Sequence, residues 1–83
     1  GVGSSLIMKM TVDNVMHQLG VKCNIENWDV GTVKGKQYDL LVTTNGFKKN
    51  FADQDNVIFL NNIIDENEAR SKVENYLKKN NLI

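Results

Sequence analysis

Residues 1–10 read GVGSSLIMKM and combine a glycine-rich start with the beginning of a helical pattern. Two glycines, Gly1 and Gly3, stand beside the hydroxyls of Ser4 and Ser5, and an amphipathic pattern follows them. Glycine lets the backbone approach a ligand closely, and the unpaired N–H groups at a helix N-terminus attract anions. We therefore expect residues 1–5 to wrap an anion such as phosphate against the start of a helix.

Two segments have the apolar spacing of amphipathic helices. The first runs from Ser4 or Ser5, as the N-cap, to Leu19, and Gly20 is expected to end it. Its core face is Met8, Val12, Val15, Met16 and Leu19. The second runs from Asp65 to about Asn80, and Asp65 with Glu68 matches an acidic capping box. Its buried stripe is Ala69, Val73, Tyr76 and Leu77.

Three segments are expected to form strands. Val21–Asn27 alternates apolar and polar residues, as an edge strand does, whereas Tyr38–Thr43 is a continuous apolar run typical of a parallel strand buried on both faces. Val57–Leu60 is a third, short strand, and Phe47–Phe51 is a short helix. Strands that alternate with helices predict an α/β fold, with a small parallel sheet flanked by helices. The length of 83 residues fits a single domain.

A parallel sheet places its binding site at the carboxyl ends of its strands. In this topology the opening stretch, Asp29–Gly35 and Thr43–Phe47 meet on one rim. These three segments are rich in Gly, Ser, Thr and Asn, so we expect a polar pocket suited to phosphate. Thr43 and Thr44 either donate hydrogen bonds into this pocket or cap the strand end.

Composition excludes several classes of function. Ten basic and ten acidic residues cancel, whereas a nucleic-acid binder carries a basic excess. One Cys and one His cannot build a structural zinc site, and we expect no metal and no cofactor. A lone cysteine favours a reducing, cytosolic setting, and no apolar run approaches the roughly 20 residues of a membrane helix.

Residues 1–10 resemble the enzyme IIB components of the bacterial sugar phosphotransferase system, and the ascorbate type of the ascorbate/galactitol superfamily is the most similar branch. In that family a strand ends in Cys-Gly-x-Gly-x-Gly-Ser-Ser, and the following helix has a similar turn with Met and Lys. A weaker likeness covers Asp29–Gly35 and Tyr38–Thr44. The resemblance implies a phosphotransferase that takes a phosphoryl group from a phosphohistidine on a IIA protein. It holds the group on the loop cysteine and passes it to a sugar, expected to be ascorbate, as the IIC transporter imports it.

The resemblance also implies site residues and a location. The phosphate-binding positions are Gly1, Val2, Gly3, Ser4 and Ser5. Possible contacts to a partner or the sugar are Leu6, Ile7, Met10, Asp29, Thr32, Thr43 and Thr44; the first three otherwise pack beneath a neighbouring element, and Asp29 and Thr32 otherwise serve the loop alone. The implied sheet has four strands in the order 2-1-3-4. The protein is expected in the cytoplasm, at the inner face of the membrane when bound to IIC.

The sequence departs from the family pattern at its start. The family's cysteine falls three residues before Gly1, and the first strand precedes it. We therefore expect the natural protein to contain that strand, and the 83 residues alone to be inactive in phosphoryl transfer. Cys23 is not a substitute, because no glycine loop or helix N-terminus lowers its pKa. We expect it to be a small apolar core residue that alkylates slowly.

Two other functions use similar elements. Low-molecular-weight tyrosine phosphatases have a Cys-x5-Arg loop, but Ser4 occupies the arginine position here, and the bidentate clamp that stabilises the transferring phosphoryl group is missing. A small module for a phosphate-bearing ligand is the other alternative. Neither Gly-Lys-Ser/Thr nor Gly-x-Gly-x-x-Gly is present to make it a nucleotide site. A receiver domain would need an acidic cluster, which Asp29 alone does not supply.

Overall fold

The structure is a computed structural model that describes residues 2–83, and for Val2 the backbone alone. Gly1, one of the predicted phosphate-binding residues, lies outside the described residues. The elements in chain order are α1 (Val2–Gln18), α2 (Val30–Val33), β1 (Leu41–Thr44), the 3₁₀ helix η1 (Asn45–Asn50), β2 (Val57–Leu60) and α3 (Glu66–Lys79). None of the described helices is long and apolar enough to span a lipid bilayer.

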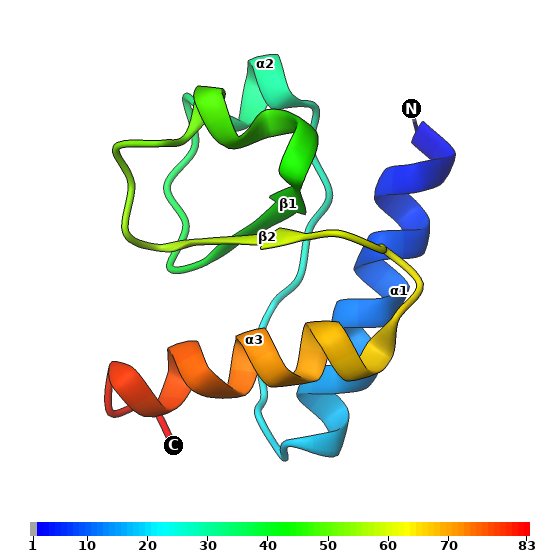
Figure 1. Cartoon of the computed structure of the whole chain (residues 1–83), viewed down its shortest axis with the longest axis vertical. Coiled ribbons are helices and arrows are strands. Elements are labelled where there is room, and N and C mark those ends of the chain that lie inside the picture. The colour runs from blue at the N-terminus through cyan, green and yellow to red at the C-terminus, as the bar shows by residue number, and fades with distance from the viewer. Residues whose placement is uncertain (1) are drawn as a thin grey trace.

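The centre of the fold is a parallel pair of strands. β1 and β2 lie in register from Leu41 opposite Val57 to Thr44 opposite Leu60. Figure 1 shows α3 along one side of this pair, crossing the C-terminal half of α1, while α2 and η1 lie beyond the other side. The core forms where α1, α3 and β2 meet, and it contains Val12, Val15, Met16, Ile58, Leu60, Ala69, Val73 and Leu77. The predicted α/β class, a small parallel sheet flanked by helices, is confirmed.

The first helix has the predicted core face and the predicted end. Val12, Val15 and Met16 are buried, and Gly20 adopts a φ of 72°. The N–H of Gly20 donates to the carbonyl of His17 at 3.1 Å, and the N–H of Val21 donates to Met16 at 2.9 Å. These two bonds make a Schellman motif, which requires a left-handed residue that glycine adopts without steric cost.

The start of this helix differs from the prediction. The helix begins at Val2, so Ser4 and Ser5 lie inside its first turns, and neither is the N-cap. Residues 2–5 therefore form helix where we expected a wrapping loop. Gly3 does not prevent this helical turn, because a glycine within a helix costs only about 1 kcal/mol relative to alanine. A Cβ at Gly3 would meet nothing within 4 Å, so no close approach requires glycine there.

The second helix agrees with the prediction to within a residue at each end. The carboxylate of Asp65, the N-cap, accepts a hydrogen bond from the N–H of Glu68 at 3.1 Å. The Glu68 side chain does not complete the capping box by bonding back to Asp65. It reaches further back, to the backbone that follows β2. The buried stripe is confirmed by Ala69, Val73 and Leu77, with Tyr76 partly buried beside them.

The strand predictions were partly wrong. Val21–Asn27 has no strand structure, because β1 pairs with β2 and no described strand pairs with this segment. Its contact with the core comes from Val21 and Ile25, and Cys23 is exposed rather than buried. The strand expected at Tyr38–Thr43 starts instead at Leu41 and ends at Thr44, with Thr43 its one buried residue. Of the implied four-stranded order, the described residues form the neighbouring pair that corresponds to strands 3 and 4.

Candidate functional site

A cavity of about 410 Å³ lies between the first turns of α1, the segment around α2 and the strand β1. It joins the three segments expected on one rim, through Ser4 and Ser5 from the opening stretch, Asp29 from the second and Thr43 and Thr44 from the third. Its full lining is Ser4, Ser5, Met8, Trp28, Asp29, Val30, Val33, Leu41, Val42, Thr43, Thr44, Phe47, Phe51 and Ile63.

Thr43 is the buried polar residue of this cavity. It is 6% exposed, and no hydrogen bond among the described residues uses its side chain. Thr11, the other buried threonine, differs because its hydroxyl lies within hydrogen-bond distance of two backbone carbonyls. Among the described residues no polar side-chain atom is both buried and without a hydrogen-bond partner. The oxygen of the Thr43 hydroxyl therefore keeps some contact with solvent, and because Thr43 lines the cavity, this hydroxyl can bond a ligand there.

The N-terminal turn of α1 adds donors to the same cavity. A helix that begins at Val2 leaves the N–H groups of its first turn, including those of Gly3 and Ser4, without intrahelical acceptors. Ser4 and Ser5 line the cavity beside that turn. Helix N-termini favour anions because these donors and the positive end of the dipole act together. The cavity therefore has one wall suited to a phosphoryl group.

The charges around the cavity are arranged unevenly. Among its described lining residues, Asp29 is the one charged side chain. It is the N-cap residue of α2, although its side chain makes no capping hydrogen bond. Two lysines stand against aromatic rings of the lining. Lys36 Nζ lies 4.1 Å from the centroid of Trp28, and Lys34 Nζ lies 5.7 Å from the centroid of Phe51. Such contacts hold a cation on a ring face, so positive charge stands close to the cavity without lining it.

Most of the cavity lining is apolar, which differs from the polar pocket that we expected. Trp28, Phe47, Phe51 and Ile63 belong to these apolar walls. Of these, the sequence analysis included Phe47 alone, at the end of the predicted rim segment Thr43–Phe47, and it named none of the four as a ligand contact. Trp28 precedes the selected Asp29, and Phe47 ends the predicted rim segment, so their positions gave a signal. Phe51 and Ile63 had no such signal, because both lie outside the three predicted rim segments and reach the cavity only through the folding of the chain.

The sequence is similar to known proteins over most of its length. The model of the PTS IIB family, described as "PTS system, Lactose/Cellobiose specific IIB subunit", matches residues 1–75, a range that contains every residue lining the cavity. The chain belongs to this family. It is also similar to the "Ascorbate-specific PTS system EIIB component" of Mycoplasma pneumoniae, with 26% identity over 83 residues that cover 93% of this chain and 85% of the relative.

The predicted IIB family is thereby confirmed, and the chain is a IIB component of sugar phosphotransfer. IIB components work in general with IIA and IIC partners. The two descriptions name different sugars, so they support a IIB component without deciding which sugar this one serves.

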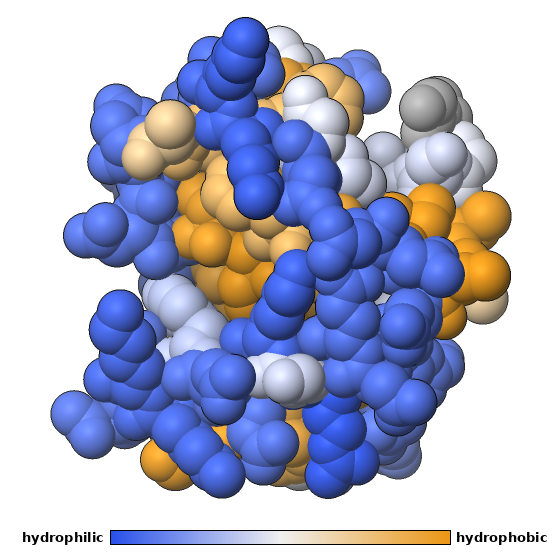
Figure 2. Space-filling model, in the orientation of Figure 1, coloured by the Kyte–Doolittle hydropathy of each residue, from blue (hydrophilic) through white to orange (hydrophobic). Residues whose placement is uncertain are grey.

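The remaining predicted residues of this IIB chain lie away from the cavity. Thr32 is exposed and does not line it. Leu6, Ile7 and Met10 are 51%, 44% and 59% exposed, so the reading in which they pack beneath a neighbouring element is wrong. Figure 2 shows apolar surface on the outer side of the N-terminal half of α1, the part of the helix that carries them.

Neither the cysteine nor the histidine of the IIB chain lies at the cavity. Cys23 is exposed, and partial burial of its thiol, followed by the nearby Asp13 carboxylate, raises its pKa. The thiol is therefore mostly protonated at neutral pH, which is the opposite of an activated nucleophile. His17 is exposed on α1.

Proposed function

We propose that this IIB chain holds a phosphoryl group in the cavity between α1 and β1. The group comes from a phosphohistidine on a IIA protein and leaves to a sugar that a IIC transporter imports. The observation that carries the proposal is that Thr43, a buried residue whose hydroxyl has no hydrogen-bond partner among the described residues, lines the same cavity as Ser4 and Ser5 in the first turns of α1.

The proposed carrier of the group is the cysteine that the family pattern places three residues before Gly1. Its thiolate sulfur attacks phosphorus, the P–N bond of the phosphohistidine breaks, and the electron pair returns to the imidazole. In the second step a sugar hydroxyl attacks, the P–S bond breaks and the hydroxyl proton passes to solvent. The chain's part is to position the group and to stabilise its equatorial oxygens, through helix N–H groups and the hydroxyls of Ser4, Ser5 and Thr43.

The lining of the cavity favours a carrier over a phosphatase. None of the described lining residues is Arg or Lys, and Ser4 stands where the phosphatase loop has arginine. Without a cation against the transferring group, attack by water gains less charge stabilisation. Slow hydrolysis suits a protein that must keep its phosphoryl group until the acceptor arrives.

The proposed partner surface is the apolar patch formed by Leu6, Ile7 and Met10, with Asp29 and Thr32 as further contacts. The patch lies on the helix whose first turns line the cavity, so a partner docked there would stand beside the phosphoryl group. We propose that the chain acts at the inner face of the membrane when it is bound to IIC. The proposed sugar is ascorbate, the sugar in the name of the relative from Mycoplasma pneumoniae.

The test uses the chain with the family's Cys-Gly-x segment joined ahead of Gly1. It is incubated with a phosphorylated IIA protein and analysed by intact mass and peptide mapping. The proposal predicts a gain of one phosphoryl group on the added cysteine, kept in the Cys23→Ser control and lost when the added cysteine is serine. A phosphoryl group on Cys23 or His17 would overturn it.

A further inference from the structure

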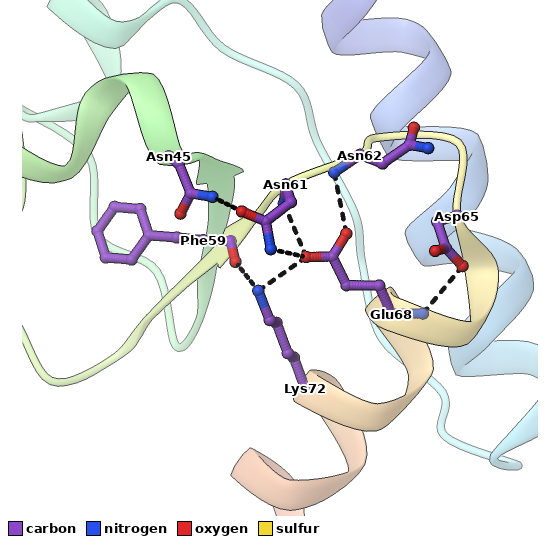
Figure 3. Close-up of polar contacts among 7 residues, drawn as sticks. All are labelled: Asn45, Phe59, Asn61, Asn62, Asp65, Glu68 and Lys72. Atoms are coloured by element: carbon purple, nitrogen blue, oxygen red, sulfur yellow. Dashed lines mark hydrogen bonds and ion pairs between the residues drawn. The ribbon is translucent and has the colours of Figure 1, made fainter.

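The carboxylate of Glu68 fills a backbone anion site at the carboxyl end of β2. Its Oε2 accepts a hydrogen bond from the N–H of Asn61 at 2.7 Å, and its Oε1 accepts one from the N–H of Asn62 at 2.9 Å. Successive N–H groups that converge in this way form a concavity that binds anions. Figure 3 shows Glu68 reaching from α3 to both groups. An internal carboxylate therefore occupies this site, although it lies at the strand ends where a phosphate ligand could otherwise bind.

Lys72, one helical turn beyond Glu68, completes the arrangement. Its Nζ lies 2.8 Å from Glu68 Oε2 and donates to the carbonyl of Phe59, in β2, at 2.6 Å. The side chain of Asn61 also donates to Glu68 Oε2 at 3.0 Å. Hydrogen bonds with a charged partner are shorter and stronger than neutral ones. We call Glu68 and Lys72, with their contacts to Phe59, Asn61 and Asn62, the α3 clamp.

Two connections lead from the α3 clamp to the walls of the cavity. Asn61 accepts a hydrogen bond from Asn45, which directly follows Thr44 at the end of β1. Ile63 directly follows the clamped Asn62. Both Thr44 and Ile63 line the cavity. The clamp thus contacts the residue next to Thr44, in the β1 segment of the lining, and the residue next to Ile63, in the turn before α3.

We propose that Glu68 and Lys72 are positioning residues that set the places of Thr44 and Ile63 in the wall of the phosphate cavity. Neither residue lines the cavity, so they act through the backbone at Asn61 and Asn62 and through Asn45. The link between this positioning and phosphate binding rests on the proposed function; the positioning itself does not.

The test compares matched ion pairs on one helix. Glu74 and Lys78 form another i,i+4 pair on α3, at 3.4 Å, and among the described residues neither has a side-chain hydrogen bond to the sheet. Glu68→Gln keeps the side chain's shape but turns an NH₂ donor toward one of the backbone N–H groups, so it breaks the site. Glu74→Gln is the control, and both are made in the full chain with circular dichroism to follow the folded fraction.

The first readout is the set of backbone amide chemical shifts. If the clamp positions the cavity wall, the amide chemical shifts of Thr44, Asn45 and Ile63 change in Glu68→Gln relative to the wild type. In Glu74→Gln the same three chemical shifts stay unchanged. Equal spectra at these residues in the two variants would overturn the proposal. If Glu68→Gln does not fold, Lys72→Met against Lys78→Met makes the same comparison, and Lys72→Arg is expected to restore the shifts of Thr44 and Ile63 toward the wild type.

The second readout is the affinity for inorganic phosphate, measured by Trp28 fluorescence and corrected for the folded fraction. We expect Glu68→Gln to weaken binding about tenfold, because Thr44, displaced from its place in the wall, loses the equivalent of one hydrogen bond to the phosphate, and Glu74→Gln to leave the affinity unchanged. Equal affinities in the two variants would contradict the positioning role. A wild-type chain that binds no phosphate would instead count against the proposed function, while the amide shifts at Thr44 and Ile63 would still decide whether the clamp positions the wall.

Discussion

The hydroxyl of Thr11 lies 2.7 Å from the carbonyl oxygen of Ile63, a residue 52 positions later in the chain. The same oxygen of Thr11 lies 3.1 Å from the carbonyl of Ile7, but a hydroxyl has one proton, so the shorter contact is the main bond. Because Ile63 lines the cavity, this bond ties the middle of α1 to the turn that walls the site.

Replacing Thr11 by Val keeps the shape of the buried side chain and removes this bond. The carbonyl of Ile63 then loses its partner, which costs about 1–3 kcal/mol. Urea unfolding should show that loss in the free energy of unfolding. Thr32→Val is the control, because Thr32 is exposed, and its effect should stay within about 0.5 kcal/mol. Equal stability of the two variants would contradict a structural role for the Thr11 bond.

Phe51 is predicted to be the most sensitive wall of the cavity. It is 1% exposed, whereas Phe47, another aromatic wall residue, is 39% exposed. Phe51→Ala should cost about 3–5 kcal/mol, a large part of the roughly 5–15 kcal/mol available to a domain. Phe47→Ala should cost about 1 kcal/mol or less, because its ring already contacts water. Thermal unfolding of both variants checks the difference, and a larger loss in Phe47→Ala would contradict the packing described.

Stability should depend on pH through Glu68. The backbone N–H of Asn61 and the ammonium of Lys72 lower the pKa of Glu68 from 4.5 to about 2. A lowered pKa stabilises the folded state fully above 4.5, and this contribution is lost as the pH falls from 4.5 toward 2. The stability difference between wild type and Glu68→Gln should therefore shrink over that range. Urea midpoints at pH 7, 4 and 2.5 test this, and a difference that stays constant in pH would rule out the shift.

Cys23 should alkylate slowly at neutral pH although it is exposed. The sequence led us to expect slow reaction from burial in the core; the structure replaces that reason with a raised pKa, caused by partial burial of the thiol and by Asp13. Asp13→Asn should speed the reaction with iodoacetamide at pH 7, because it removes a charge that opposes the thiolate. Asp39→Asn is the matched control. Mass spectrometry gives both rates, and no acceleration in Asp13→Asn would exclude the electrostatic contribution.

A charge placed in the apolar patch on α1 should weaken partner binding without lowering the stability of the fold. Leu6→Glu changes a side chain that is 51% exposed, so its stability should change by about 0.5 kcal/mol or less. Transfer from a phosphorylated IIA protein to the chain that carries the added Cys-Gly-x segment should nevertheless slow, since a charge is buried against the partner. Lys22→Glu, on the exposed segment after α1, serves as the control. Transfer at the wild-type rate in Leu6→Glu would remove Leu6 from the docking surface.

The bodies of α1 and α3 could be predicted from the sequence because their signals are local, whereas the start of α1 at Val2 and the short helix α2 were not predicted. The spacing of Val12, Val15 and Met16, the glycine at position 20 and the N-cap Asp65 lie within the helices they define or directly beside them. The strand expected at Val21–Asn27 failed because a strand also needs a partner, and alternation says nothing about which segment pairs with it.

The site was predictable to the extent that topology determines it. Ser4, Asp29 and Thr43 share the cavity, as the predicted rim required. Of the three, Thr43 alone lies at the carboxyl end of a described strand, where parallel sheets place their sites, whereas Ser4 lies in α1 and Asp29 directly precedes α2. The apolar walls Phe51 and Ile63 and the contacts of Glu68 depend on packing between distant segments, for which the sequence holds no periodic signal.

The central claim is that the cavity between α1 and β1 binds the phosphoryl group. A titration of the chain with inorganic phosphate, followed by backbone amide chemical shifts, tests it most directly. We expect the largest changes at Gly3, Ser4, Ser5, Thr43 and Thr44, and we expect Thr43→Val to weaken the binding of phosphate. Changes that gather instead around Lys34, Lys36 and Asn56, which line a separate hollow, would contradict it.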